Sequence, residues 1–395
     1  MADAQGRETN AGGYQCHLKA CKLGGTVNPS DARAEVRGYT VSATQEFLAK
    51  WEADGGAVFH MECWQILSDL ANRSKVTNLC SKEKSLVLEA EDTAELHQSM
   101  DSLTADATRI ARMIKECKYP IAFTGAGIST SAGIGDFRGI HGKWTNRDKE
   151  KDHGSQKEGK AKAKRNVMSL RPTYTHEALL KLIEMGYLQY IISQNTDGLH
   201  RLSGIPEDKI SELHGNGFVE KCEKCNKRYV MNHNHRLGPK DPKVPVKKCE
   251  HCRINHRTGR ICPDPKCKGY LMNTIINFGD NLEEHVLSSA IHNAEKADMV
   301  LTLGSTLKVS PANSLVTMGQ TPVKLVICNR QITPYDDVCE KKDPSTKAQL
   351  GCRVFGDCDD LMRVVMRQLM DAGQLEEWER GREERCQSYD GRRQN

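Results

Sequence analysis

The 395-residue chain has a formal net charge of +5, and 28% of its residues are charged against 38% that are hydrophobic. This balance is typical of a water-soluble globular protein; the mild charge alone does not indicate nucleic-acid binding, and no apolar run of about 18 residues is present to span a membrane. The N-terminal stretch MADAQGRETNAGG lacks the apolar core of a secretory signal, so we expect the sixteen cysteines in a reducing compartment, where clustered cysteines bind metal more often than they form disulfides.

Composition divides the chain into five segments. Residues 1–13 are expected to be a disordered tail, and residues 14–70 form a compact segment that contains cysteine and histidine. Residues 71–102 are polar and acidic, which predicts a linker or an exposed helix. An alternating α/β pattern occupies residues 103–370, and residues 371–395 are expected to be a polar tail.

The N-terminal segment contains a candidate zinc site formed by Cys16, Cys21, His60 and Cys63. The H-x-x-C pair followed by tryptophan is typical of ligands carried by a helix, although C-x4-C is a loose first pair. The alternative is that these are ordinary buried cysteines and a core histidine. The stretch FHMECW resembles part of the zinc fingers of poly-ADP-ribose polymerases, although the C-x4-C pair departs from their tighter spacing.

Helical and strand patterns alternate through the central segment. Residues 104–118 have apolar spacing suited to a helix and precede a buried strand, IAFT, and a glycine-rich turn. Further strands are predicted in LQYIIS, MVLTLG, KLVICN and GCRVFG, and further helices over residues 282–297 and 359–370. Such alternation predicts a parallel sheet covered on both faces, which is a Rossmann-like, doubly wound fold.

Two stretches interrupt this pattern. The basic loop, residues 146–169, is rich in lysine, which favours a solvated and flexible loop over a surface for an acidic partner or an import receptor. Residues 220–273 contain six cysteines and several prolines with little periodicity. So long a stretch without predicted helices or strands needs a covalent or metal cross-link to hold it together.

The cross-link in residues 220–273 is predicted to be a structural zinc ion. Cys222 and Cys225 have the spacing of a zinc knuckle, and four thiolates would leave no open position for a catalytic water. The second pair is either Cys249 and Cys252 or Cys262 and Cys267, and C-x-x-C spacing alone favours the first of these.

The glycine-rich turn reads TGAGISTSAGIGDFRG and follows a predicted strand. Gly125 and Gly127 would let the backbone approach a pyrophosphate, and a following helix N-terminus would favour its charge. A dinucleotide fingerprint would place a third glycine at Thr130, and it has no use for the Asp-Phe-Arg that ends the stretch.

Several motifs occur together in a fixed order: GAGIST, GDFRG, SQNTDGLH, ELHGN, the cysteine pairs and LGSTLKVSP. This set resembles the sirtuins, which are NAD-dependent protein deacylases, over roughly residues 103 to 369. GKWT, RPTYTH and SQNTDGLHRLSGIP are most similar to the nuclear, chromatin-associated class IV branch. The branch context around GRICPDPKCKGYLMNTI implies that Cys262 and Cys267 complete the zinc site.

The resemblance also implies the residues of the site. His214 would be the general base, supported by Asn195 and Asp197, while His176 and His200 would serve packing or hydrogen bonding. An acyl-lysine segment would lie as an added strand between Phe278–Gly279 and Val309–Ser310. The residues implied to bind NAD are Gly125, Ala126, Gly127, Ser129, Asp136, Phe137, Arg138, Gln194, Asn195, Asp197, Gly304, Ser305 and Asn329.

The implied function is transfer of an acyl group from lysine to ADP-ribose, with NAD as co-substrate and release of nicotinamide. Expected substrates are histone tails or other nuclear proteins, and the expected location is the nucleus rather than the cytoplasm. The alternatives are mono-ADP-ribosyl transfer, or a chromatin- or DNA-binding protein with vestigial catalysis that uses the N-terminal segment and the basic loop.

Three residues depart from the family pattern. Thr196 stands in place of a branched apolar residue, Gly135 in place of proline, and Thr306 in place of serine. Loss of the proline ring at Gly135 predicts a more mobile turn before Asp136 and weaker deacetylation.

Overall fold

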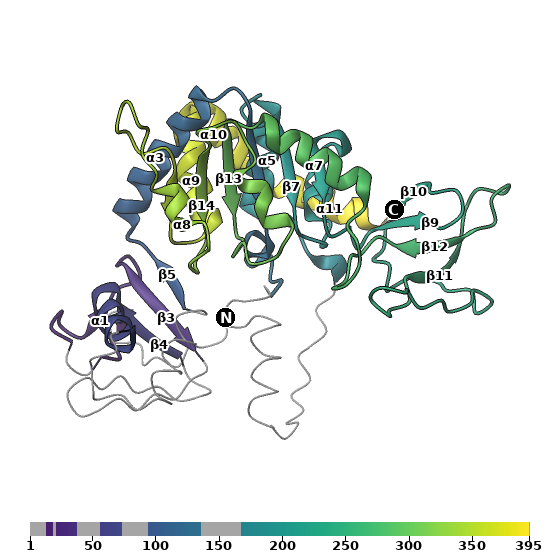
Figure 1. Cartoon of the computed structure of the whole chain (residues 1–395), viewed down its shortest axis with the longest axis horizontal. Helices are drawn as coiled ribbons and strands as arrows, with labels where there is room; N and C mark the ends of the chain where they lie inside the picture. The colour runs from purple at the N-terminus through teal and green to yellow at the C-terminus, as the bar shows by residue number, and fades with distance from the viewer. Residues whose placement is uncertain (1–12, 19–20, 38–55, 73–93, 136–166, 395) are drawn as a thin grey trace, which may run out of the picture.

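The computed structural model describes residues 13–18, 21–37, 56–72, 94–135 and 167–394 (Figure 1). Three sequence expectations lie outside these residues: the tail up to residue 12, the trio Asp136, Phe137 and Arg138, and the basic loop as far as residue 166. Among the described residues, no helix combines the length and the hydropathy needed to cross a membrane.

The centre of the molecule is a parallel sheet of six strands in the order β15-β14-β13-β6-β7-β8. The predicted parallel sheet is therefore confirmed, and β8 is an additional short strand. The strands are β6 (Pro120–Thr124), β7 (Tyr190–Ser193), β8 (Ile210–Glu212), β13 (Met299–Leu303), β14 (Lys324–Cys328) and β15 (Cys352–Val354).

Helices cover both faces of this sheet, because successive strand residues point to opposite sides. Ala122 and Leu301 belong to the core shared with α3 (Met100–Glu116), α5 (Tyr174–Glu184) and α9 (Cys358–Leu369). Phe123 and Val300 point to the other face and pack with α7 (Glu284–Lys296), the 3₁₀ helix η4 (Ala312–Thr317) and α8 (Asp336–Cys339). This two-sided arrangement (Figure 1) is Rossmann-like, as predicted.

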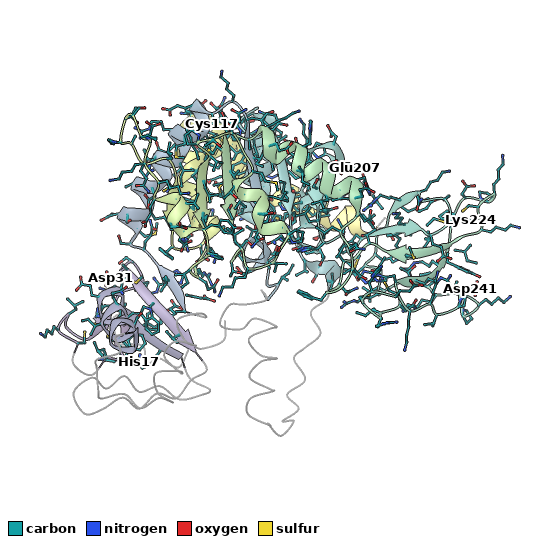
Figure 2. All side chains as sticks on the ribbon, in the orientation of Figure 1. His17, Asp31, Cys117, Glu207, Lys224 and Asp241 are labelled. Atoms are coloured by element: carbon teal, nitrogen blue, oxygen red, sulfur yellow. The ribbon has the colours of Figure 1, made fainter. Side chains whose placement is uncertain are left out.

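A smaller antiparallel sheet projects from one end of the molecule (Figure 1), and it carries Lys224 and Asp241 (Figure 2). Its order is β10-β9-β12-β11, formed by β9 (Val219–Cys222), β10 (Arg228–Val230), β11 (Arg257–Ile261) and β12 (Tyr270–Asn273). Its buried apolar cluster consists of Cys222, Cys262, Cys267 and Leu271. So small a core supplies little hydrophobic stabilisation, and a bound metal would contribute the remainder.

The N-terminal residues form a separate small unit around Phe59, Trp64 and Leu67. Its strands are β1 (Tyr14–Gln15), β2 (Thr26–Val27), β3 (Arg33–Arg37), β4 (Gly56–His60) and β5 (Glu95–His97), and its helix is α1 (Met61–Asn72). Strand β5 pairs with β3, although its residues fall within the segment expected to be a linker.

The C-terminal residues, expected to be a polar tail, instead form α10 (Ala372–Arg380) and α11 (Arg382–Gln394). Tyr389 is buried, and its hydroxyl donates to Glu177 Oε1 at 3.1 Å. Arg385 donates to the other oxygen of the same carboxylate at 3.0 Å. These contacts order the helix because Glu177 is itself buried in α5 and needs donors for its charge.

Candidate active site

The glycine-rich turn meets the loop after β13 at the carboxyl edge of the sheet. The amide of Gly125 donates to the carbonyl of Leu303 at 3.0 Å, and that of Gly127 donates to Gly304 at 2.8 Å. The neighbouring strand β7 ends at Ser193, so Gln194 leaves the sheet at the same edge. Open α/β sheets bind their ligands at this edge.

The glycines at this junction are required by the packing of the two loops. A Cβ on Gly125 would lie 2.6 Å from the carbonyl oxygen of Gly304. A Cβ on Gly127 would lie 2.6 Å from the Cα of Gly304. Gly304 has φ +64°, and a Cβ there would lie 2.5 Å from the amide nitrogen of Ile128. From the sequence, Gly125 and Gly127 were explained by the approach of a pyrophosphate to the backbone. The structure gives a second reason, which is that the two loops pack too closely for a side chain at either position.

The turn continues into the 3₁₀ helix η1 (Ala126–Ser129) rather than the α-helix start expected from the sequence. Its amides bond three residues back, from Ile128 to Gly125 and from Thr130 to Gly127, at 3.2 and 3.4 Å. The tight turn brings Ala126 and Ser129 of the motif to the edge of the sheet.

A buried polar network joins this turn to the loop after β7. The Asn195 amide donates to the Gly125 carbonyl at 3.0 Å and to Ser129 Oγ at 3.4 Å. Ser129 in turn donates to Asp197 Oδ2 at 2.7 Å, while Asp197 Oδ1 accepts the amide of Leu199 at the start of α6 (Leu199–Ser203). The structure therefore gathers four of the residues that the sequence implicated in NAD binding: Gly125, Ser129, Asn195 and Asp197.

His214 is held by the loop after β7. Its Nδ1 lies 3.0 Å from the carbonyl oxygen of Gln194, whose side chain accepts a hydrogen bond from Ser305 Oγ at 2.8 Å. Because a carbonyl oxygen only accepts, Nδ1 carries the proton and Nε2 keeps its lone pair. Burial lowers the pKa of His214, although the bond to Gln194 acts in the opposite direction. The imidazole is therefore neutral at neutral pH, as a general base must be.

Three residues that the sequence analysis did not single out fix the backbone around His214. Gly215 has φ +78°, and a Cβ there would lie 1.8 Å from the Thr274 carbonyl. Asn216 donates to the buried Glu212 at 2.6 Å, and its amide donates to Thr274 Oγ1 at 3.0 Å. For Gly215 and Asn216 the signal was present in ELHGN, where a glycine and two polar residues surround the histidine.

The other two histidines of the motifs are structural, as predicted. The rings of His176 and His200 lie 4.8 Å apart, and burial lowers their pKa values to about 4 and about 3. His200 Nε2 pairs with Thr124 Oγ1 at 2.9 Å, and His176 Nδ1 pairs with Thr173 Oγ1 at 2.8 Å in the capping box of α5.

The projecting sheet brings four cysteines together: Cys222, Cys225, Cys262 and Cys267. The sulfur atoms of Cys222 and Cys267 lie 3.5 Å apart, and those of Cys225 and Cys262 lie 3.8 Å apart. Ligands of a tetrahedral zinc ion stand roughly 3.3–3.8 Å apart, so this set fits a closed structural site. Cys249 and Cys252, which spacing alone favoured, lie elsewhere.

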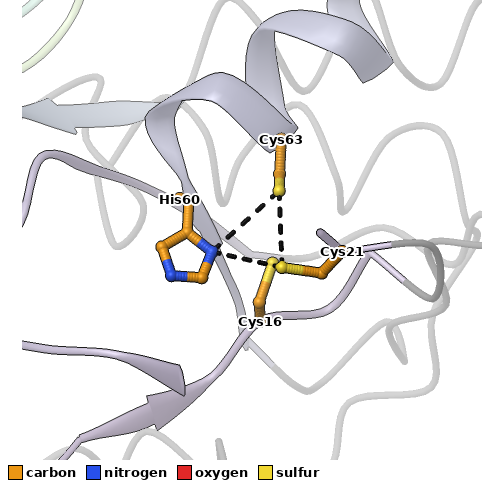
Figure 3. Close-up of side chains that lie close together, drawn as sticks. All are labelled: Cys16, Cys21, His60 and Cys63. Atoms are coloured by element: carbon orange, nitrogen blue, oxygen red, sulfur yellow. Dashed lines mark hydrogen bonds between the residues drawn. The ribbon is translucent and has the colours of Figure 1, made fainter. Parts of the chain in front are cut away.

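A second set lies in the N-terminal unit, where Cys16, Cys21, His60 and Cys63 face one another (Figure 3). His60 Nδ1 lies 3.5 Å from Cys21 Sγ and 3.9 Å from Cys63 Sγ. The opposite ring nitrogen donates to the Thr26 carbonyl at 2.8 Å, which leaves Nδ1 free to bind a metal. These residues also fit zinc.

The sequence profile of the Sir2 family matches residues 125–311. The NAD-dependent protein deacetylase Sirt6 of Drosophila melanogaster is 36% identical over 246 residues, which cover 61% of this chain and 72% of that protein. The chain belongs to the Sir2, or sirtuin, family.

Other sirtuins match the same region. The NAD-dependent protein deacetylase SRT1 of Arabidopsis thaliana is 37% identical over 247 residues, which cover 62% of this chain. They cover 47% of the plant protein, so this chain spans about half the length of that relative. A solved structure described as Sir2-p53 peptide-NAD+ aligns over 66% of this chain and 97% of its own, with 29% identity and a TM-score of 0.44.

The remaining site residues expected for a sirtuin lie on three further segments. Asn329 directly follows β14 and is buried, and its side chain donates to the Gln331 carbonyl at 3.0 Å. Phe278 is 70% exposed, and Gly279 beside it has φ +94°. Val309 is half-buried in the loop before η4. The added substrate strand between these segments stays a prediction.

Proposed function

We propose that the protein is an NAD-dependent protein-lysine deacylase of the sirtuin type. The observation that carries this proposal is the state of His214, whose Nδ1 is tied to Gln194 while Nε2 is left to accept a proton. His214 follows β8, and the loop after β7 that holds it also carries Asn195 and Asp197, which lie beside the glycine turn. The named relatives are NAD-dependent protein deacetylases, which agrees with this assignment.

Each side chain has a distinct task in the proposed reaction. NAD, when bound, supplies the ribose to which the acyl group is transferred as nicotinamide leaves. The amide of Asn195 and the carboxylate of Asp197 would orient the nicotinamide ribose, and Ser129 holds that carboxylate in place. His214 would accept a proton from a ribose hydroxyl through Nε2. The segments at Phe278 and Val309 would hold the acyl-lysine peptide.

Two structural zinc ions complete the proposal, one on Cys222, Cys225, Cys262 and Cys267 and one in the N-terminal unit. We further propose membership of the nuclear class IV branch, with histone tails or other chromatin proteins as substrates. The N-terminal unit, as a zinc-finger-like module, and the basic loop would contact chromatin or DNA. The motif resemblance supports this placement, together with the fit of the N-terminal residues to a metal site.

The test is nicotinamide release from NAD in the presence of acetyl, myristoyl and unmodified histone peptides. We expect release that depends on an acyl peptide and falls by about 10²–10⁴-fold in His214→Ala, because the general base is lost. His292→Ala is the control, since that histidine is exposed on α7. Undiminished release in His214→Ala would remove the assignment of the base.

Two other outcomes would replace the proposal. Labelling of the protein substrate by ADP-ribose without loss of the acyl group would indicate mono-ADP-ribosyl transfer. Absence of both reactions, together with salt-sensitive binding to DNA, would indicate a chromatin-binding protein.

A further inference from the structure

A third cluster of metal-ligating side chains lies outside both zinc sites described above. It consists of Cys249, Cys252, His256 and Asp280, whose ligand atoms all lie within 4.8 Å of one another. We propose that this cluster binds a third structural zinc ion. The ion would link the stretch between β10 and β11 to the segment that follows β12.

The distances within the cluster suit a tetrahedral ion. Cys249 Sγ lies 3.2 Å from Asp280 Oδ1, and Cys252 Sγ lies 3.2 Å from His256 Nε2. His256 Nε2 lies 3.3 Å from Asp280 Oδ2. On one tetrahedral zinc ion, two nitrogen or oxygen ligands stand roughly 3.3 Å apart and a sulfur ligand stands roughly 3.5 Å from either, so all three separations are close to those expected. Two cysteines, a histidine and a carboxylate are all accepted zinc ligands.

The backbone around Cys249 repeats the turn found at Cys222. The amide of Cys249 donates to the carbonyl of Ile254, and that of Arg253 donates back to Cys249, at 2.9 and 3.1 Å. At the four-cysteine site, the amide of Cys222 donates to the carbonyl of Lys227, and the amide of Asn226 donates to the carbonyl of Cys222. Both bonds are 3.0 Å long.

The residue after the second cysteine is left-handed in both turns, with φ 64° at Arg253 and φ 58° at Asn226. A left-handed arginine is uncommon, so the match to the first knuckle is specific. The turn at Cys249 therefore has the form that directs two thiolates at one ion.

A neighbouring side chain orients His256, and a backbone amide orients Asp280. The Asn273 side-chain amide donates to the His256 carbonyl at 2.9 Å, which leaves its oxygen to accept from His256 Nδ1 at 3.3 Å. The lone pair of His256 is then on Nε2, which faces the sulfur atoms. Asp280 Oδ2 accepts the amide of Asn277 at 3.0 Å. Such outer partners are typical of metal-binding histidines and carboxylates.

The position of the cluster gives the ion a role in the site, and this step rests on the proposed function. The amide of Ile276 donates to the carbonyl of His214 at 3.1 Å, and the chain then runs through Phe278 and Gly279 to Asp280. A Cβ on Gly279 would lie 3.4 Å from the carbonyl oxygen of His251, inside the knuckle. The ion would therefore hold the proposed peptide-binding segment against the knuckle.

An ion can reach the cluster from solvent. Cys249, His256 and Asp280 line an open cleft of about 390 Å³, together with Lys248 and Ile276. A site with an entry path can be emptied by a chelator and refilled, which makes its occupancy measurable.

The first experiment counts zinc per chain by mass spectrometry of the purified full-length protein. We expect Cys249→Ser/Cys252→Ser to hold one zinc fewer than the unaltered protein. The matched control is Cys117→Ser/Cys386→Ser, because these cysteines are also half-buried and belong to none of the three clusters. An unchanged count in Cys249→Ser/Cys252→Ser would overturn the proposal.

A second measurement needs no substitution, so it holds even where the double variant fails to fold. Iodoacetamide labelling of the native protein is mapped by mass spectrometry, with Cys386 as the reference thiol. We expect Cys249 and Cys252 to be labelled at least ten-fold more slowly than Cys386, and to lose this protection when a mild chelator is added. Equal labelling without chelator, or a disulfide between the two, would overturn the site.

The role in peptide binding is tested separately through Asp280→Asn. We expect a several-fold rise in KM for the acyl peptide with kcat and KM for NAD nearly unchanged, because the variant loosens one segment only. An unchanged peptide KM in a variant that has lost one zinc would remove the link to the substrate segment. Lack of deacylase activity in the unaltered protein would refute the proposed function, while the zinc count would still decide the site.

Discussion

The three histidines near the sheet edge differ because their surroundings differ. His176 and His200 are fully enclosed and bonded to threonines, and burial keeps both rings neutral at any pH above about 4. His214 is half-buried, and only its Nδ1 is committed to the protein backbone. A neutral ring with an available Nε2 is what proton abstraction requires.

The pH dependence of the reaction should report His214. Its pKa lies below the ordinary value of about 6.5, and the proposed reaction needs the neutral form. The rate should therefore be flat above pH 6.5 and fall as pH decreases through the lowered pKa. His176 and His200 titrate at about 4 and about 3, so they do not contribute near pH 6.

The measurement is kcat/KM for an acyl peptide from pH 5 to 8.5. His292→Ala should leave the profile unchanged, because that side chain is exposed on α7. A rate that still rises between pH 7 and 8 would show that His214 is not the group being titrated.

The grouping of the candidate site residues was predictable from the sequence where a motif carries its own chemistry. His214, Asn195 and Asp197 stand in motifs whose order is specific, and the structure gathers them at the edge of the sheet. Thr274 could not be found in this way, because it contacts Asn216 across 58 positions and nothing in its local sequence marks it. Asp280 was missed for the same reason, since its partner cysteines lie about thirty residues earlier.

At the scale of loops and strands, the junction between the glycine turn and the loop after β13 has no room for side chains. Gly304 has a left-handed backbone conformation. In addition, backbone atoms of Gly127 and Ile128 occupy the space that a Cβ on Gly304 would need. Gly135, ten residues beyond the start of the glycine turn, has neither constraint, because a Cβ there would meet nothing within 4 Å.

Gly304→Ala should lower the free energy of unfolding by about 1–3 kcal/mol, through left-handed strain and displacement of the glycine turn. Gly135→Ala is the matched control and should change stability by less than about 1 kcal/mol, with stabilisation favoured. Urea unfolding of the two variants measures the difference. Equal stabilities would mean that the loops can separate without cost.

The central strands and their helices were predicted because apolar runs and helical spacing are local properties of the sequence. Strands β6, β7, β13, β14 and β15 and helices α3, α7 and α9 are confirmed. The pairing of the zinc cysteines is not local, and spacing alone pointed to Cys249 and Cys252. Strand β5 was missed because its three residues are ordered by pairing with β3, about sixty positions earlier.

At the scale of the whole molecule, the N-terminal unit is joined to the Rossmann-like core through Arg330. Its guanidinium pairs with Glu95 of β5 at 2.8 Å and with Asp357 at the start of α9. Its carbonyl accepts the amide of Leu96 at 2.8 Å, and the Gln98 amide bonds to the carbonyl of Phe355 at the same distance. Arg330 directly follows Asn329, so this joint adjoins the proposed adenosine end of the NAD site.

Arg330→Ala should destabilise the protein by on the order of 1–3 kcal/mol, because the buried Glu95 loses its charged partner. We also expect the N-terminal unit to unfold at lower denaturant than the core. Trp64, which packs against Phe59, reports on the N-terminal unit by fluorescence, and α9 and the sheet report on the core through circular dichroism. The control is Arg380→Ala, whose partner Glu376 is exposed, and it should change stability by about 0.5 kcal/mol or less. A single unchanged transition in Arg330→Ala would contradict the joint.

The carboxylate of Glu177 sets a limit on where the catalytic unit can be cut. It is 2% exposed and receives Arg382 and Arg385 as well as the Tyr389 hydroxyl, all from α11. A chain stopped near residue 370 would remove these three groups, and with them the contacts that α11 makes to the buried carboxylate of α5. The helices that pack on this core therefore extend to Tyr389, about twenty residues beyond residue 370, where the motifs alone would end the unit.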